Sequence, residues 1–158
     1  PRETVVRLVD PVMFTVPFFY MTGHGIMIYS REEIDNLRKA LTAGAFLLGD
    51  ACNGKGHGFD RSFRELIRRL FPEKSLQPLS MKHPVFNSFF QINKVLGGDK
   101  FIDPFVEGLE VNNRLAILYT VNDLGCAWEG HPCRPGGEEQ RDHAFRMGIN
   151  SIVYSMTH

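Results

Sequence analysis

The pattern of apolar and polar positions near the start of the chain predicts two strands. Residues 5–9 are mostly branched and apolar, and they end at Asp10-Pro11, where proline pushes the preceding residue out of helical geometry. Residues 17–21 are apolar throughout, which is typical of a strand that is buried on both faces of a sheet. This second strand opens into a glycine loop at residues 22–25.

An amphipathic helix is predicted over residues 31–43. Ser30 and Glu33 can form a capping box, in which each side chain bonds the backbone N–H of the other residue at the helix start. Apolar residues then recur at spacings of three and four, which places them on one helical face. That face is expected to cover the sheet.

A third strand and a second helix follow. Residues 45–49 are apolar up to a glycine, and the polar exit of this strand, residues 50–58, is rich in glycine. Asp60 is then expected to cap a helix with an apolar stripe, which ends before Pro72.

The second half of the chain is less regular. Prolines interrupt residues 75–113, where only a weak strand near residues 90–92 is predicted. Residues 114–121 form a clear buried strand that leads into the polar loop 122–126. A closing helix is expected to bury one apolar face, which is made by Phe145, Ile149, Ile152, Val153 and Met156.

Strands that alternate with helices, and that are apolar without a two-residue rhythm, favour a three-layer α/β/α sandwich with a mostly parallel sheet. Residues 1–158 are expected to form a single domain. The carboxyl ends of parallel strands meet at one edge, where ligands bind in such sheets. The loops at residues 22–25, 50–58 and 122–126 should therefore converge on the candidate site.

Charge narrows the choice of partners. The chain has 158 residues, with 18 Lys plus Arg and 18 Asp plus Glu, so its formal net charge is zero. A neutral chain has no global field to attract a polyanion, and we expect no nucleic-acid partner. No apolar run approaches the roughly 18 residues of a membrane span, so we expect no membrane insertion by this domain. Because the chain starts at Pro1 and enters an apolar segment within its first five residues, an N-terminal portion is expected to be missing.

Cys52 is the sharpest catalytic candidate, because it lies on a glycine-flanked turn between a predicted strand and a predicted helix. In a cysteine-dependent hydrolase, His24 or His57 would act as its base, and Asp50 or Asp123 would orient that base. A cysteine near the end of a buried strand is more often a small core residue, and this alternative leads.

The other hypothesis needs no nucleophile: the strand-end edge binds a small polar ligand or a protein partner. Its candidate residues are polar groups and one glycine at the ends of predicted strands, namely Gly23, His24, Asp50, Asn53, His57, Arg61, Asn122 and Asp123. Asp and Asn are also favoured wherever a strand turns, because their side chains bond the nearby backbone. Arg61, Arg64 and Arg68 share a helix face, where surface ion pairs are the common alternative to anion binding.

The three cysteines allow further interpretations. Together with His24, His57 and His131 they could supply a zinc site, but Cys126 and Cys133 are spaced too widely for a typical cysteine pair. A disulfide between Cys126 and Cys133 is an alternative in an exported protein, and free thiols are expected in a reducing compartment. We expect neither a resident metal nor an organic cofactor.

Several segments together resemble a bacterial family known as domain of unknown function 4159. They are residues 20–25, 33–41, 46–50, 71–72, 83–84, 114–123 and 148–154. Residues 18–53 are also similar to class I glutamine amidotransferase-like domains, to whose superfamily the family is assigned. The resemblance implies a flavodoxin-like fold, an N-terminal strand and helix that precede this chain, and a location in the cell envelope.

Two departures from the superfamily's pattern argue against glutaminase activity. Active amidotransferases place the nucleophile in a Gly-X-Cys-X-Gly turn, whereas Gly49 here lies three residues before Cys52. No His-X-Glu sequence stands near the C-terminus to supply the base. If the domain is an enzyme, a different cysteine-dependent hydrolysis is expected.

Overall fold

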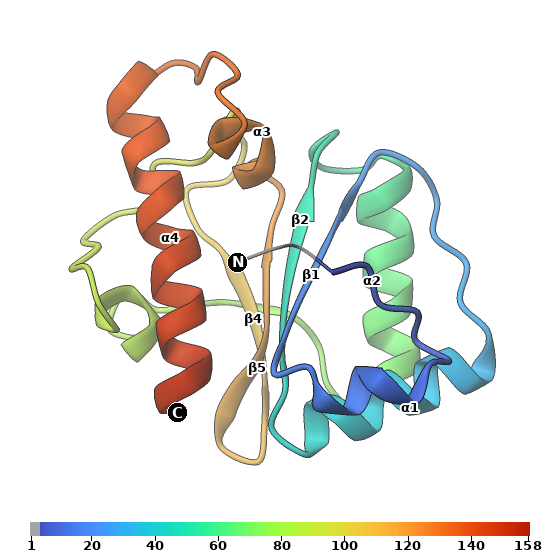
Figure 1. The fold of residues 1–158 in the computed structure, drawn as a ribbon. Helices are drawn as coiled ribbons and strands as arrows, with labels where there is room; N and C mark the ends of the chain where they lie inside the picture. The colour runs from blue at the N-terminus through green and yellow to red at the C-terminus, as the bar shows by residue number, and fades with distance from the viewer. Residues whose placement is uncertain (1–3) are drawn as a thin grey trace.

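The computed structural model describes residues 4–158, which form a sheet covered by helices on both faces (Figure 1). Helices α1 (Arg31–Thr42) and α2 (Gly58–Leu70) lie on one face. Helices α3 (Leu124–Trp128) and α4 (Gly137–Thr157) lie on the other face. The α/β class expected from the sequence is confirmed. No helix in the described part of the chain combines the length and apolar character needed to cross a membrane.

The sheet has five strands in the order β1-β2-β5-β4-β3. Strands β1 (Phe18–Gly23), β2 (Phe46–Ala51) and β5 (Arg114–Thr120) are parallel to one another. Strands β4 (Glu107–Val111) and β3 (Gln77–Pro78) extend the sheet in antiparallel fashion from β5. The sheet is therefore mixed, and the expected parallel arrangement holds only for β1, β2 and β5.

Strand β2 is buried along its whole length, because each face packs into a separate core. Phe46 and Leu48 belong to the core beneath α4, whereas Leu47 and Ala51 belong to the core beneath α1 and α2. Burial on both sides explains why the strand is apolar without a two-residue rhythm.

The start of α1 follows its local sequence. The Glu33 N–H donates to Ser30 Oγ at 3.2 Å, and the Ser30 N–H donates to Glu33 Oε2 at 2.7 Å. The predicted capping box is confirmed, and each bond satisfies a backbone N–H that the helix itself cannot pair.

The strand predicted over residues 5–9 is wrong. Its described residues form no strand, and the short 3₁₀ helix η1 (Pro11–Thr15) follows them. Only Leu8 in this run is buried, while Val5 is 96% exposed. The branched side chains therefore gain little burial that would favour a strand.

The weak strand predicted near residues 90–92 is also wrong. Asn150 Oδ1 accepts hydrogen bonds from the Phe89 and Phe90 N–H groups, and Asn150 Nδ2 donates to the Phe90 carbonyl. The Ile92 N–H bonds the Phe86 carbonyl in the 3₁₀ helix η2 (Pro84–Asn87). A buried asparagine of α4 thus pairs backbone groups that a neighbouring strand would have paired.

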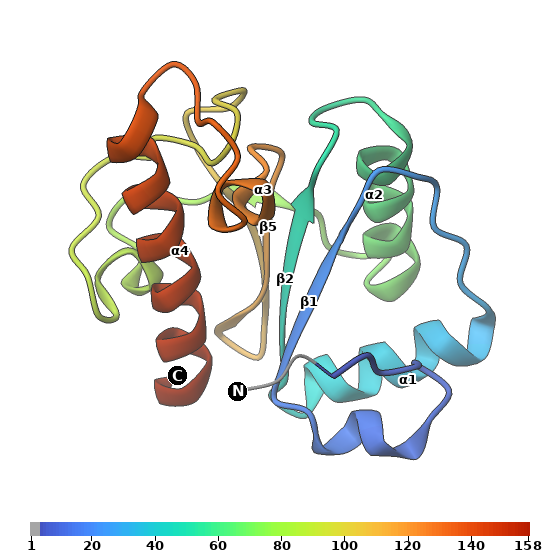
Figure 2. The same cartoon turned by 45° about the horizontal axis from the view of Figure 1, so that its top comes forward.

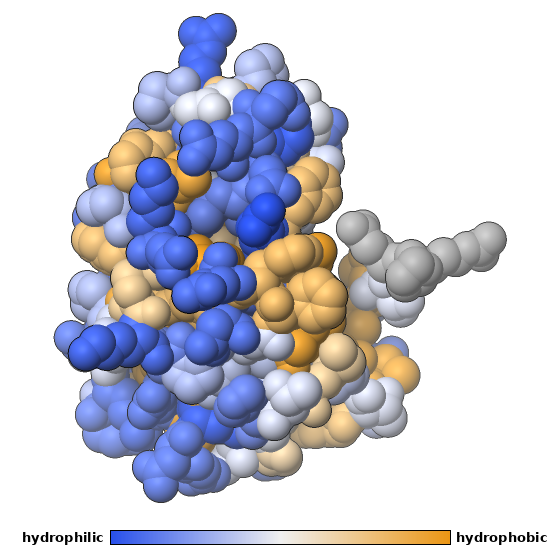
Figure 3. Space-filling model, turned by 90° about the vertical axis from the view of Figure 1, so that its left-hand side faces the viewer, coloured by the Kyte–Doolittle hydropathy of each residue, from blue (hydrophilic) through white to orange (hydrophobic). Residues whose placement is uncertain are grey.

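Helix α4 is present as predicted, but the predicted buried face is wrong. Phe145, Ile149, Ile152 and Met156 are all at least 39% exposed, and Figure 3 shows apolar surface among charged side chains on this side of the molecule. The buried face combines small and polar residues with two large side chains, Met147 and Tyr154. Its members are Gln140, His143, Ala144, Met147, Gly148, Asn150, Ser151 and Tyr154. A Cβ on Gly148 would come within 2.8 Å of the Trp128 ring, so close packing against α3 selects small residues there.

Candidate functional site

The three predicted loops meet at the carboxyl edge of the parallel strands, which Figure 2 turns toward the viewer. Thr22 of β1 is in register with Asp50 of β2, and Asp50 is in register with Thr120 of β5, so the three strands end level with one another. Asn53 Nδ2 donates to the His24 carbonyl at 3.4 Å, which links the loops after β1 and β2. The expected convergence is confirmed.

Asp50 lies fully buried at the end of β2 and bonds the first turn of α3, whose N-cap residue is Asp123. Its carboxylate accepts hydrogen bonds from the Leu124 N–H at 2.9 Å, the Gly125 N–H at 2.8 Å and the Tyr20 hydroxyl at 3.0 Å. Burial raises the pKa of Asp50 to about 6, although these hydrogen bonds oppose the shift. All three bonds stay inside the protein, so the group organises the edge and does not project toward a ligand.

Asp123 is also buried, in the left-handed conformation with φ 60°. Its Oδ1 accepts from the Cys126 N–H at 3.1 Å, and its Oδ2 lies 2.8 Å from Lys100 Nζ. Burial lowers the pKa of Lys100, but the carboxylates of Asp123 and Asp99 more than offset this and hold it above its ordinary range. The Lys100–Asp123 salt bridge therefore links the segment 97–103 to the loop after β5.

Asn122 secures the same segment. Its Oδ1 accepts from the Ile102 N–H at 2.8 Å and the Asp103 N–H at 3.0 Å, and its Nδ2 donates to the Asp103 carbonyl at 2.8 Å. Asn122 is 1% exposed, and the amide oxygen and nitrogen of its side chain both bond protein groups. The segment 97–103 therefore covers this part of the edge.

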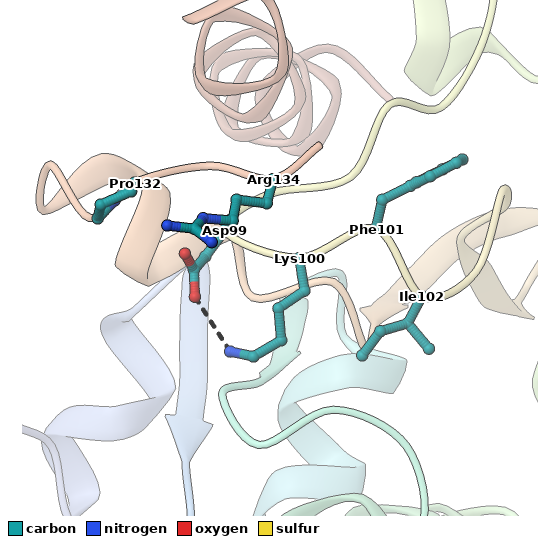
Figure 4. Close-up of a pocket in the computed structure, with 6 residues that line it drawn as sticks. All are labelled: Asp99, Lys100, Phe101, Ile102, Pro132 and Arg134. Carbon is teal, nitrogen blue, oxygen red and sulfur yellow. Dashed lines mark hydrogen bonds and ion pairs between the residues drawn. The ribbon is translucent and has the colours of Figure 1, made fainter. Parts of the chain in front are cut away.

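Lys100 was missed by sequence reasoning, yet it is central to the edge. Besides Asp123 it reaches the Asp99 carboxylate and the Cys52 carbonyl, at 3.1 and 2.9 Å. It also lines an open hollow of about 460 Å³, shown in Figure 4, whose lining residues are Asp99, Lys100, Phe101, Ile102, Pro132 and Arg134. The segment that carries Lys100 packs closely against the loop after β5, because a Cβ on Gly98 would collide with the Asp123 carbonyl oxygen. This contact is made in the folded protein and leaves no local sequence signal for Lys100.

Cys52 is 9% exposed, and its sulfur lies 3.3 Å from the sulfur of Cys126. Burial raises the pKa of the Cys52 thiol, so the reactive thiolate is disfavoured. The imidazoles of His24 and His57 are both exposed, and within residues 4–158 neither makes a hydrogen bond to the Cys52 sulfur. The structure thus gives Cys52 a second thiol as its neighbour instead of a base.

The other sulfur contacts differ from the sequence expectations. Cys133 is buried and donates to the His131 carbonyl at 3.6 Å, whereas the near partner of Cys126 is Cys52. Among the described residues, two clusters hold possible metal-ligand atoms within 4.8 Å of one another. They are Cys52, Asp123 and Cys126, and Cys126, Glu129 and His131. His24 and His57 belong to neither cluster.

Asp60 was expected to cap α2, but the N-cap residue is His57. Asp60 lies inside the first turn, where Oδ2 accepts from the Gly56 N–H at 2.7 Å. Its Oδ1 accepts from the Tyr119 hydroxyl at 2.7 Å and from Arg64 Nε at 2.9 Å. This nearly buried carboxylate thus connects the glycine loop, α2 and β5.

Arg64 and Arg68 form ion pairs with carboxylates of the same chain, whereas Arg61 forms none with any described residue. Arg64 binds both carboxylate oxygens of Glu107 on β4, and Arg68 pairs with Glu65 one turn away on α2. Arg61 makes no ion pair or side-chain hydrogen bond with any described residue. Of the three arginines on this helix face, two are therefore paired with carboxylates, and Arg61 is exposed without such a partner among the described residues.

The polar side chains that remain exposed at the edge come from two neighbouring loops and the start of α2. They are His24, Asn53, His57 and Arg61. His57 makes no side-chain capping hydrogen bond, so its imidazole does not occupy the helix N-terminus. Gly23 lets the buried Phe59 ring pack closely against the end of β1, because a Cβ there would lie 3.2 Å from that ring.

The fold and this edge together define an α/β domain with a mixed sheet, in which buried carboxylates organise loops around an exposed polar rim. The chain belongs to the protein family described as Domain of unknown function (DUF4159), whose model matches residues 1–156. The family expected from the sequence is confirmed. No curated protein sequence matches the chain.

Proposed function

We propose that this domain binds a small polar, negatively charged ligand at its carboxyl edge and does not act as a glutaminase. The observation that carries the proposal is that four polar side chains stay exposed on the loops after β1 and β2 and at the start of α2, where Asn53 links the two loops. They are His24, Asn53, His57 and Arg61. Asp50, Asn122 and Asp123 support this edge from beneath through their internal hydrogen bonds.

The charges at this position favour an anion. The N-terminus of a helix carries a partial positive charge and presents unpaired N–H groups, and α2 has 13 residues. Arg61 lies in its first turns with its guanidinium directed to solvent, and His57 immediately precedes the helix. Lys55 is already paired with Asp103, which leaves Arg61 as the principal charged contact in the proposal.

The proposal includes a flavodoxin-like, class I glutamine amidotransferase-like fold in which the nucleophile has been lost. In open α/β sheets, ligands bind outside the carboxyl ends of the strands, which is where the exposed polar rim lies. Glutamine hydrolysis needs a thiolate beside a base, whereas the Cys52 thiol is buried against Cys126. Binding without this chemistry requires only the exposed rim.

Titration of the ¹⁵N-labelled protein with inorganic phosphate, and separately with succinate, tests the proposal. We expect amide shifts concentrated in residues 53–61, and an affinity reduced at least about tenfold in Arg61→Gln, since a hydrogen bond to a charged group contributes roughly 1.5–3 kcal/mol. Arg68→Gln is the matched control, because Arg68 is exposed on the same helix but lies near its other end.

Two results would contradict the proposal. One is the absence of localised shifts with both anions, and the other is equal loss of affinity in the Arg61 and Arg68 variants. Release of ammonia from glutamine by the wild type, abolished in Cys52→Ala, would instead establish the glutaminase reaction that the proposal excludes.

A further inference from the structure

Cys52 and Cys126 come from distant parts of the chain but face each other at the carboxyl edge. Their sulfur atoms are 3.3 Å apart, although 74 residues separate them in sequence. A disulfide bond is about 2.05 Å long, so the sulfurs need to approach by roughly 1.2 Å to form one. Cys52 follows β2 directly, and Cys126 lies in α3, which follows β5.

Both cysteine backbones are held by neighbouring segments. The Cys52 N–H donates to the Gly23 carbonyl at 3.2 Å, and the Cys52 carbonyl accepts from Lys100 Nζ at 2.9 Å. The Cys126 N–H donates to Asp123 Oδ1 at 3.1 Å. These contacts fix the two thiols opposite each other in the folded protein.

The surroundings of the three cysteines favour pairing of Cys52 with Cys126 and leave this pair accessible to a small oxidant. Cys126 is half-buried, so it is the more accessible of the two to a small oxidant, whereas Cys52 is 9% exposed. Cys133, the remaining cysteine of the chain, is buried and directs its thiol to the His131 carbonyl. Within the described residues it therefore does not compete for either sulfur.

We propose that Cys52 and Cys126 are a redox-responsive pair, which forms a disulfide that ties the loop after β2 to α3 at the edge. This inference is independent of the proposed anion site, since no residue of the exposed rim takes part. It differs from the pairing of Cys126 with Cys133 that the sequence suggested as an alternative.

The oxidant is a small disulfide of the glutathione type. The Cys126 thiolate attacks one sulfur of that molecule, which breaks its S–S bond and releases one thiolate. The Cys52 thiolate then attacks Cys126 Sγ, forms the protein disulfide and releases the second thiolate. Each protein thiol gives up its proton before it attacks, and the two released small thiolates take up these two protons. Two protein thiols thus become one disulfide, and one small disulfide becomes two small thiols.

A metal ion is the competing occupant, because Asp123 lies with both sulfurs in a cluster of possible ligands. The Asp123 carboxylate is already neutralised by the Lys100 ammonium at 2.8 Å, and its other oxygen accepts the Cys126 N–H. A cation would have to displace an existing positive charge. Disulfide formation leaves this ion pair in place, so the geometry favours the disulfide.

The test uses the reduced 158-residue protein, equilibrated with oxidised glutathione, acid-quenched, alkylated and digested for peptide mass mapping. We expect one cross-linked pair of peptides that contains Cys52 and Cys126, while Cys133 is alkylated only after unfolding. Dithiothreitol should restore both thiols. The oxidised protein should also show a higher melting temperature than the reduced protein.

Three variants sharpen the interpretation. Cys133→Ala is expected to retain the cross-link and the rise in melting temperature, whereas Cys52→Ala and Cys126→Ala should lose both. The mapping of the wild type decides the question even if a variant fails to fold.

Three results would overturn the proposal. The first is that both thiols stay reduced at equilibrium, and the second is a cross-link through Cys133. The third is a stoichiometric zinc ion in the purified protein that protects Cys52 and Cys126 from alkylation until a chelator removes it, because this would assign the pair to a metal site.

Discussion

Asp50 Oδ1 accepts a hydrogen bond from the Leu124 N–H at 2.9 Å, so a carboxylate at the end of β2 bonds the first turn of the helix that follows β5. Asp50 and Leu124 lie 74 residues apart in sequence, and the contact joins the end of β2 to α3, the helix that follows the neighbouring strand β5. It fixes the position of α3, and thereby places Cys126 opposite Cys52. This buried acid thus links the end of β2 to the start of α3 at the carboxyl edge.

This burial gives the stability of the protein a characteristic pH dependence. The pKa of Asp50 is raised to about 6 in the folded protein, above the roughly 3.9 of an unfolded aspartate. The folded state therefore holds the proton more tightly. The stabilising contribution of this protonated group is complete below about pH 4, and it is lost as the pH rises through about 6.

We expect Asp50→Asn to abolish this decrease in the free energy of unfolding with rising pH. For the rise in the Asp50 pKa given above, the decrease is roughly 2–3 kcal/mol. The measurement is the free energy of unfolding in urea at several pH values between 4 and 7. Asp35→Asn is the control, because Asp35 is an exposed partner of Arg38 and is expected to leave the profile unchanged. A variant of Asp50 with the wild-type profile would show that this carboxyl group is not the source.

His143 is expected to act in the opposite direction. Its Nε2 accepts from the Leu96 N–H at 3.2 Å, so Nδ1 carries the hydrogen that bonds the Gly97 carbonyl at 2.9 Å. Burial lowers the pKa of His143, and the folded protein keeps the ring neutral. Its contribution to stability is therefore present above about pH 6.5, the ordinary value of an unfolded histidine, and is lost as the pH falls below it.

The corresponding experiment compares urea unfolding of the wild type and His143→Gln between pH 5 and 8. The difference in unfolding free energy between the two proteins should shrink as the pH falls. Burial also lowers the pKa of His83, so His83 adds its own pH dependence to both proteins. Subtracting the unfolding free energy of His143→Gln from that of the wild type removes this shared contribution. His131→Gln serves as an exposed control, and a difference independent of pH would refute the assignment to His143.

Asn122 provides a prediction about local stability. Its amide makes three hydrogen bonds to Ile102 and Asp103, which hold the segment 97–103 over the edge. In Asn122→Ala, amide hydrogen exchange at residues 102 and 103 should accelerate at least about tenfold, because each buried group left unpaired costs roughly 1–3 kcal/mol. Exposed Asn87→Ala is the control. Equal acceleration throughout β5 would indicate global destabilisation instead.

Elements with complete local signals were predictable from the sequence. The capping box of Ser30 and Glu33 defines the start of α1, and unbroken apolar runs define β1, β2 and β5. Strand β4 was missed because its sequence, Glu107–Val111, is short and contains a glycine and two glutamates. It is a strand because it pairs with β5, and tertiary pairing of this kind leaves little trace in local propensity.

The candidate site shows the same limit. The convergence of three loops follows from strand order, and it was predicted. The contact between Cys52 and Cys126 was not, because it depends on the position of α3. Sequence spacing directed attention to Cys126 and Cys133, seven positions apart, although proximity along the chain does not determine which sulfurs meet.

Helix α4 gives a sharp test of which face is buried. Gly148 lies where a Cβ would come within 2.8 Å of the Trp128 ring, although alanine is intrinsically the better helix former by about 1 kcal/mol. We therefore expect Gly148→Ala to destabilise the protein despite its favourable propensity. If α4 buried the larger apolar residues instead, this substitution would face solvent and stabilise the helix.

A pair of truncations completes the argument. Met147 is fully buried, and Met147→Ala should reduce the free energy of unfolding by about 2–5 kcal/mol, because it removes packed atoms and leaves a cavity. Ile152 is 45% exposed, so Ile152→Ala should cost less than about 1 kcal/mol. Urea denaturation of both variants measures the difference. The more costly truncation marks the face of α4 that lies in the core. If Ile152→Ala cost more than Met147→Ala, the face predicted from the sequence, which contains Ile152, would be the buried one.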